Sequence, residues 1–267
     1  MTYTVGIDIG STYTKAVVID KDHTILGRTM NPTGFRLTEI ATTTYREVLS
    51  LAGVAEDEIG YTVATGFGRH QAKSSDVQVT DLTAAARGAA FLFPGTRTVL
   101  DVGGQTMKAS RLSDTARVQS FRLNDKCAAG TGAFLEKTAR YMGYSTKEIG
   151  PLVATSKEAT EISGVCAVFA ESEVINQLSL GTPPADIMHG AIVSLVGRSI
   201  QLMKRVRMEP EYTLIGGILR FERMVDVVRH ELSAEVNVPP GDLVQYTSAL
   251  GAAILGRKRL EKIRAAA

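Results

Sequence analysis

The sequence of 267 residues lacks the features that mark membrane, secreted and zinc-binding proteins. It has no apolar run that approaches the length of a membrane-spanning helix, and no basic segment or small-residue cleavage site follows Met1. Its four histidines are scattered without the spacing of zinc ligands. We therefore expect a cytoplasmic protein that needs no membrane, and in that compartment a disulfide between its two cysteines is not expected.

Two familiar nucleotide-binding motifs are missing as well. There is no Walker A sequence, and no Gly-x-Gly-x-x-Gly motif follows a predicted strand, which argues against P-loop and dinucleotide-binding folds. Ser163 and Ser172 have no histidine base nearby, which gives hydrolase chemistry little support. The net charge of +2 gives no reason to expect a nucleic acid as partner.

What the sequence does contain is an internal repeat. Asp8-Ile9-Gly10-Ser11-Thr12-Tyr13-Thr14-Lys15 recurs in pattern as Asp101-Val102-Gly103-Gly104-Gln105-Thr106-Met107-Lys108. Each copy follows a short apolar strand and places Gly two residues, and Lys seven residues, after an Asp. A Gly-rich segment between two strands is typical of a β-hairpin turn.

Hydrophobic periodicity predicts the same order of elements around both copies. The predicted strands are residues 3–7, 15–19, 24–30, 61–64, 98–100, 108–112, 118–123 and 212–215. The predicted helices are residues 37–51, 81–93, 128–142, 169–180, 186–206, 219–232 and 248–263. We therefore predict an α/β protein of two related lobes, the first formed by residues 1–95 with the C-terminal helix 246–267 and the second by residues 96–245.

The two predicted hairpins have the composition of a phosphate-binding site. Tight turns of small residues present backbone N–H groups to phosphate oxygens. We expect this role for Gly10, Ser11, Thr12, Tyr13, Thr14, Gly103, Gly104 and Gln105, with Lys15 as a charge partner of the phosphates. Asp8 and Asp101 supply one carboxylate from each lobe to hold Mg²⁺ through water. Together with Gln105 they are the candidates for orienting the attacking water.

A second glycine motif follows the predicted strand 212–215. The missing side chains of Gly216 and Gly217 would let a flat purine approach the backbone closely. The alternative is an ordinary pair of glycines that caps the next helix. After two phosphate hairpins, an adenosine contact is the interpretation that we adopt, with ATP or ADP as the nucleotide.

The two cysteines, Cys127 and Cys166, each precede a predicted helix in a Gly- and Ala-rich stretch. Thiolates ligate iron and are stabilised at helix N-termini. An iron–sulfur cubane is usually held by four of them, so two from each subunit of a symmetric dimer would complete one site. The alternative is that each cysteine is a small buried hydrophobic residue.

These motifs together resemble the actin/hexokinase/Hsp70 ATPase superfamily. Within it, residues 124–132, which contain Cys127, and residues 168–175, which follow Cys166, are similar to one branch: the activators of 2-hydroxyacyl-CoA dehydratases and the ATP-hydrolysing subunits of benzoyl-CoA reductase. The resemblance covers nearly the whole chain. It implies two ribonuclease-H-like lobes with a nucleotide cleft between them. One departure is Thr106, because the branch often has aspartate after Gly-Gly-Gln.

The resemblance also implies cofactors and partners. These are a 4Fe–4S cluster shared between two subunits, Mg²⁺ with ATP or ADP, and a second copy of the chain or a related ATPase subunit. They further include an acyl-CoA dehydratase or benzoyl-CoA reductase component as electron acceptor and ferredoxin or flavodoxin as electron donor. The implied function is ATP-driven transfer of a low-potential electron.

Two alternatives remain open. A small-molecule kinase of the same superfamily, acting on a sugar or pantothenate-like hydroxyl, would need a carboxylate base beside a substrate pocket, and the sequence shows no convincing one. An actin-like filament protein or regulator would need no cluster.

Overall fold

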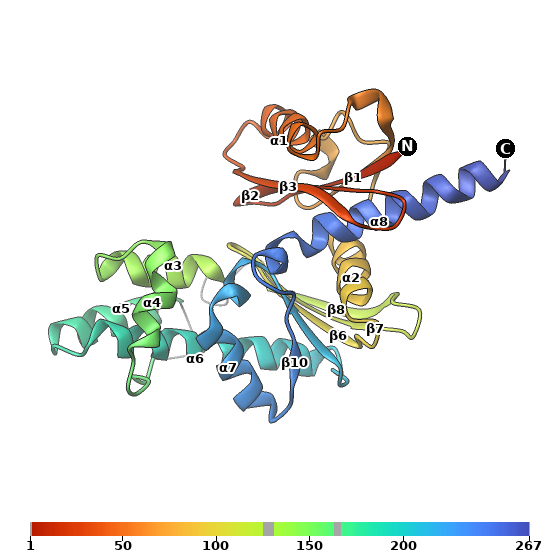
Figure 1. The fold of residues 1–267 in the computed structure, drawn as a ribbon. Helices are drawn as coiled ribbons and strands as arrows, with labels where there is room; N and C mark the ends of the chain where they lie inside the picture. Colours follow the sequence, from red (N-terminus) through yellow and green to blue (C-terminus); the bar gives the residue numbers. More distant parts are fainter. Residues whose placement is uncertain (1, 125–130, 163–166, 267) are drawn as a thin grey trace. The chain divides into compact units, whose positions relative to one another are not determined.

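The computed structural model describes residues 2–124, 131–162 and 167–266. Two compact units make up the chain (Figure 1). The first contains residues Met1–Thr96, Leu112–Val118 and Gln245–Ala267, and the second contains Arg97–Arg111 and Gln119–Val244. None of the helices in the described ranges is both long enough and apolar enough to cross a membrane.

The elements confirm an α/β protein. Its strands are β1 (Tyr3–Ile9), β2 (Tyr13–Ile19), β3 (Ile25–Pro32), β4 (Ile59–Thr65), β5 (Val77–Gln78), β6 (Thr98–Val102), β7 (Met107–Leu112), β8 (Val118–Asn124), β9 (Tyr212–Ile215) and β10 (Val236–Asn237). Its α-helices are α1 (Leu37–Ala52), α2 (Asp81–Leu92), α3 (Gly132–Tyr141), α4 (Ile149–Ala154), α5 (Ala167–Ser179), α6 (Pro184–Arg205), α7 (Glu222–Leu232) and α8 (Leu243–Ala266).

The first unit is built on a five-stranded sheet with the order β3-β2-β1-β4-β5. Strands β1, β2 and β3 pair antiparallel, whereas β4 pairs parallel to β1. Alternate residues of β1, among them Ile7 and Ile9, form a core with Tyr45 and Val48 of α1, which covers this face (Figure 1). On the other face, Val63 of β4 packs with residues of α2 and α8.

The second unit repeats this topology. Its sheet has the order β10-β9-β6-β7-β8, with β6 and β7 antiparallel and β9 parallel to β6. Strands β6 to β10 therefore correspond in sheet position to the strands of the first unit, with β6 and β9 in the places of β1 and β4. Helix α6 runs through the core of this unit and packs against α3, α4, α5 and α7. The internal repeat seen in the sequence is a repeat of the whole sheet.

Several elements differ from the sequence prediction. Strands β5 and β10, together with α4, were not predicted. The helix predicted at 219–232 is divided into a 3-10 helix, η5 (Gly217–Arg220), and α7. The helix predicted at 128–142 begins at Gly132 in the described part of the chain, and residues 125–130 lie outside it.

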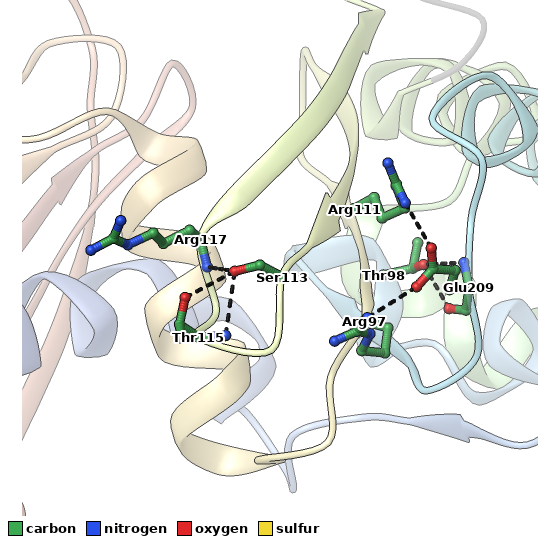
Figure 2. Close-up of polar contacts among 7 residues, drawn as sticks. All are labelled: Arg97, Thr98, Arg111, Ser113, Thr115, Arg117 and Glu209. Atoms are coloured by element: carbon green, nitrogen blue, oxygen red, sulfur yellow. Dashed lines mark hydrogen bonds and ion pairs between the residues drawn. The ribbon is translucent and has the colours of Figure 1, made fainter.

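An ion-pair cluster ties the strands of the second sheet together at the end where β6 begins (Figure 2). Glu209, just before β9, accepts hydrogen bonds from Arg111 (2.7 Å) and Arg97 (3.3 Å). Its backbone N–H donates to the hydroxyl of Thr98 at 2.9 Å, and that hydroxyl donates to its carbonyl at 2.7 Å. These arginines hold the pKa of Glu209 below its usual value. Figure 2 also shows Ser113, whose hydroxyl accepts the amides of Thr115 and Arg117 in the β7–β8 turn.

Candidate nucleotide-binding site

The first hairpin joins β1 to β2 in a turn that its neighbours hold in place. Gly10 donates its N–H to the carbonyl of Tyr13 across the turn (3.1 Å). Thr33, which follows β3, donates its N–H to the carbonyl of Thr12 (2.9 Å) and its hydroxyl to the carbonyl of Gly10 (2.8 Å). The hydroxyl of Thr14 is bonded to the same Thr33 hydroxyl at 3.0 Å. The side chain of Thr14 therefore helps to hold the turn in place.

Asp8 and Lys15 face each other across this hairpin. They are direct cross-strand partners in the antiparallel register. Nζ of Lys15 lies 3.2 Å from Oδ2 of Asp8, and the two side chains are only 18% and 11% exposed. The ammonium balances the carboxylate charge at the carboxyl end of β1 and fixes the position of Asp8.

The hydroxyl of Thr12 is unusual because it is buried and has no hydrogen-bond partner among the described residues. A buried hydroxyl without a partner destabilises a fold by about 1–3 kcal/mol. Such groups are therefore usually hydrogen-bonded by water or by a ligand. Ser11 beside it is half-buried and Tyr13 is 42% exposed. An oxygen of a phosphate would satisfy Thr12, so the hairpin fits the predicted ligand.

The second hairpin repeats the arrangement of the first. Gly103 donates its N–H to the carbonyl of Thr106 at 2.8 Å. Nζ of Lys108 lies 3.4 Å from Oδ2 of Asp101, and both side chains are mostly buried. Gln105 is exposed at the tip of the turn. The structure thus adds Lys108 to the predicted residues, and the equal Asp-to-Lys spacing of the two copies was the signal that pointed to it.

The Gly216-Gly217 turn after β9 lies against Asp101. Gly216 has a φ of +101°, and a Cβ atom on it would be 2.4 Å from the carbonyl oxygen of Val102 and 2.8 Å from Oδ1 of Asp101. Only glycine fits such a conformation and such a close approach. Gly216 also caps the 3-10 helix η5. The structure therefore brings Asp101 and Gly216 together within the second unit, and the contact with adenosine stays a prediction.

Sequence reasoning missed the counterpart of this turn in the first unit. Gly66 follows β4 with a φ of +89°, and a Cβ atom on it would be 2.4 Å from Oδ1 of Asp8 and 2.6 Å from the carbonyl oxygen of Ile9. Gly66 therefore lies against the carboxylate of Asp8 in the same way as Gly216 lies against that of Asp101. The signal was a glycine directly after the strand predicted at 61–64, in the same place of the repeat as Gly216.

Helix α3 begins on the second hairpin. The backbone N–H groups of Gly132 and Ala133 donate to the carbonyls of Gly103 (2.9 Å) and Gly104 (2.7 Å). Gly132 also lies against Ile218 of the η5 turn, because a Cβ atom on it would be 2.6 Å from Cδ1 of Ile218. The first turn of α3 therefore contacts both the predicted phosphate turn and the predicted adenosine turn.

The two cysteines, Cys127 and Cys166, lie outside the described residues. The helices that follow them in the sequence, α3 and α5, are joined by an ion pair. Nζ of Lys137 on α3 lies 2.6 Å from Oε2 of Glu171 on α5. The hydroxyl of Tyr141 donates to the same oxygen at 3.4 Å.

A serine, a histidine and an aspartate meet at the start of α6, but not as a hydrolytic triad. Ser156 donates its hydroxyl to Asp186 (2.8 Å) and lies 3.0 Å from Nδ1 of His189. The hydroxyl proton therefore points to the carboxylate, and the histidine cannot accept it there. The Ser156 hydroxyl, followed by the amides of Lys157 and Glu158, lowers the pKa of Asp186. Burial, followed by the charge of Arg223, lowers the pKa of His189. Ser163 lies outside the described residues.

Comparison with known proteins identifies the family. Residues 5–256 match the BadF/BadG/BcrA/BcrD ATPase family. The chain is 36% identical to a 2-hydroxyisocaproyl-CoA dehydratase activator from Clostridioides difficile over 94% of both chains. It is 32% identical to a benzoyl-CoA reductase subunit from Thauera aromatica over 98% of this chain and 96% of that one. The chain belongs to the BadF/BadG/BcrA/BcrD ATPase family.

A solved structure supports the same conclusion. The activator of the 2-hydroxyisocaproyl-CoA dehydratase from Clostridium difficile, with bound ADPNP, matches with a TM-score of 0.93 and 34% identity over 100% of this chain and 98% of that one. The fold is that of the actin-like ATPases, as the sequence resemblance predicted.

Proposed function

We propose that this protein is an ATP-hydrolysing activator that passes a low-potential electron to a CoA-thioester dehydratase or reductase. The observation that carries the proposal is the start of α3, where the amides of Gly132 and Ala133 bond to the carbonyls of the Gly103-Gly104 turn. A change in the phosphate turn would reach the helix that follows Cys127 without any intervening side chain. The names of the relatives support the choice of partner.

The nucleotide would be held by the glycine turns of both units. In each unit a lysine-paired aspartate lies at the end of the central strand. Asp8 and Asp101 would hold Mg²⁺ through water, and Mg²⁺ when bound would neutralise phosphate charge. Gln105, exposed at its turn, would help to orient the water that attacks the terminal phosphate. ATP and water become ADP and phosphate.

Cys127 and Cys166 of two subunits would together hold one 4Fe–4S cluster, which supplies one-electron chemistry when bound. This part of the proposal rests on the sequence and on the resemblance. The electron would come from reduced ferredoxin or flavodoxin and pass to the acyl-CoA dehydratase or benzoyl-CoA reductase component. The Lys137–Glu171 ion pair supports a joint movement of α3 and α5, because it ties the two helices together.

Two forms of this function differ in assembly. A stand-alone activator would be a homodimer that serves a separate dehydratase, whereas a benzoyl-CoA reductase subunit would pair with a related ATPase subunit in a permanent complex. Purification from native cells separates them, because only the second form copurifies with the reductase.

The proposal is tested by anaerobic purification of the wild type and of Cys127→Ser. We expect a brown wild-type protein with about four iron atoms per dimer and ATP-dependent transfer of an electron to the partner. Cys127→Ser should lose both iron and transfer. A colourless wild-type protein that phosphorylates a small hydroxyl compound would instead show a kinase, and unchanged iron in Cys127→Ser would refute the assignment of the ligands.

A further inference from the structure

The segment from Thr65 to Arg69 wraps around the carboxyl end of β1. Thr65 ends β4 and is the parallel register partner of Asp8, so the two side chains lie on the same face of the sheet. Gly66 lies against Oδ1 of Asp8, and Gly68 donates its N–H to the carbonyl of Ile9 at 2.9 Å. This segment is therefore fixed beside the candidate aspartate of the first unit.

The hydroxyl of Thr65 is the first sign of a ligand here. Thr65 is fully buried, and its Oγ1 atom has no hydrogen-bond partner among the described residues. The hydroxyl of Thr12, in the neighbouring hairpin, is buried and unpartnered in the same way. Two such hydroxyls from segments that both adjoin Asp8 indicate that a polar ligand completes the site.

The guanidinium of Arg69 is the second sign. It donates one N–H from Nη1 to the carbonyl of Gly66 at 3.1 Å, which holds it over the loop next to Asp8. Arg69 is half-buried, and in the described part of the chain no carboxylate forms an ion pair with it. A guanidinium has five N–H donors, so donors remain for an anion.

We propose that Thr65 and Arg69 bind the terminal phosphate of a nucleoside triphosphate, as a part of the nucleotide site outside both hairpins. This inference rests on the proposed ATP site. The terminal phosphate is the group assigned to it because the segment adjoins Asp8, the candidate for orienting the attacking water. The Thr65 hydroxyl donates one hydrogen bond to a phosphate oxygen, and Arg69 donates a second and balances its charge.

The test compares the dissociation constants of ADPNP and ADP, measured by titration calorimetry with Mg²⁺. Thr65→Val keeps the shape of the side chain and breaks no side-chain hydrogen bond to the described residues, so it should fold with an unchanged melting temperature. We expect Thr65→Val and Arg69→Gln each to weaken ADPNP binding about 10- to 100-fold and ADP binding less than about twofold. Thr65→Ser, which keeps the hydroxyl, should bind ADPNP like the wild type.

Matched controls make the result specific. Thr138→Val removes another buried hydroxyl, on α3, that has no partner in the ranges the structure describes. Arg46→Gln removes an exposed arginine on α1 of the first unit. Both should leave the affinities for ADPNP and ADP unchanged. The inference is wrong if Thr65→Val and Arg69→Gln keep the wild-type preference for ADPNP or weaken both nucleotides equally. Failure of the wild type to bind either nucleotide would refute the proposed ATPase function instead.

Discussion

Lys15 and Asp8 form a nearly buried ion pair across the first hairpin, with 3.2 Å between Nζ and Oδ2. Because the pair is mostly shielded from water, removal of one partner leaves an uncompensated charge. We expect Lys15→Met to lower the free energy of unfolding by about 1–3 kcal/mol, measured by urea denaturation. The double variant Asp8→Asn/Lys15→Met should recover part of that loss.

Lys21 offers a matched control. It lies 3.8 Å from Asp22 with both side chains about two-thirds exposed, so Lys21→Met should change the free energy of unfolding by less than about 0.5 kcal/mol. Equal effects of Lys15→Met and Lys21→Met would show that the hairpin pair does not stabilise the fold.

Substitutions of Thr106 test whether a carboxylate after Gly-Gly-Gln helps to orient the attacking water. Its carbonyl accepts the N–H of Gly103, a backbone contact that any side chain would preserve. We expect Thr106→Asp to raise the kcat of ATP hydrolysis about 10-fold or more, because the new carboxylate can orient the attacking water. Thr106→Asn adds similar volume without the charge and should leave kcat near that of the wild type. Identical rates in all three proteins would exclude this role.

Gly216 should not tolerate a side chain. Gly216→Ala would place a methyl group 2.4 Å from the carbonyl of Val102 at a φ of +101°, and we expect it to lower the free energy of unfolding by about 2 kcal/mol or more. Gly197 lies inside α6, and no atom of the described residues comes within 4 Å of the position of its absent Cβ. Gly197→Ala should therefore raise the free energy of unfolding by about 0.5–1 kcal/mol. Thermal unfolding of both variants checks the opposite signs.

Glu209 should make the free energy of unfolding depend on pH in the acidic range. Hydrogen bonds from Arg111 and then Arg97 lower the pKa of Glu209 in the folded state. Its contribution is therefore present above the unfolded pKa and is lost as pH falls through the folded pKa. Glu209→Gln should be less stable than the wild type at pH 7, and the difference should shrink below about pH 4.

The pH dependence has an exposed control. Glu235 is 97% exposed and lies 3.7 Å from Arg229, so the stability of Glu235→Gln should match that of the wild type at every pH in this range. A difference between Glu209→Gln and the wild type that stays constant from pH 7 down to about pH 2 would contradict the assignment. Urea midpoints at each pH provide the measurement.

The sequence predicted two related lobes because each copy places short apolar strands around the same Asp-x-Gly spacing. It missed β5 and β10, which are two residues long and too short for any periodicity. It also missed α4, where Gly150-Pro151 looks like a break. Proline is tolerated in the first turn of a helix because its missing N–H has no intrahelical partner there.

The candidate site could be chosen from the sequence where residue type carries the chemistry, and its contacts with a nucleotide stay a prediction. Asp8, Asp101 and the glycine turns follow from what a phosphate and Mg²⁺ require. Thr65 and Gly66 were missed because an isolated Thr-Gly after a strand looks like an ordinary loop. Its position beside Asp8 depends on the parallel pairing of β4 with β1, which no local pattern encodes.

The bonds from Gly132 and Ala133 to the Gly103-Gly104 turn use main-chain atoms only. Such a link does not depend on the chemistry of the side chains, although a Cβ atom at Gly132 would lie 2.6 Å from Cδ1 of Ile218, so a larger residue there requires Ile218 to shift. Among natural residues only proline lacks the N–H donor, so proline at position 132 or 133 would break the link. Substitutions that keep both amide donors therefore keep the link between the turn and the helix.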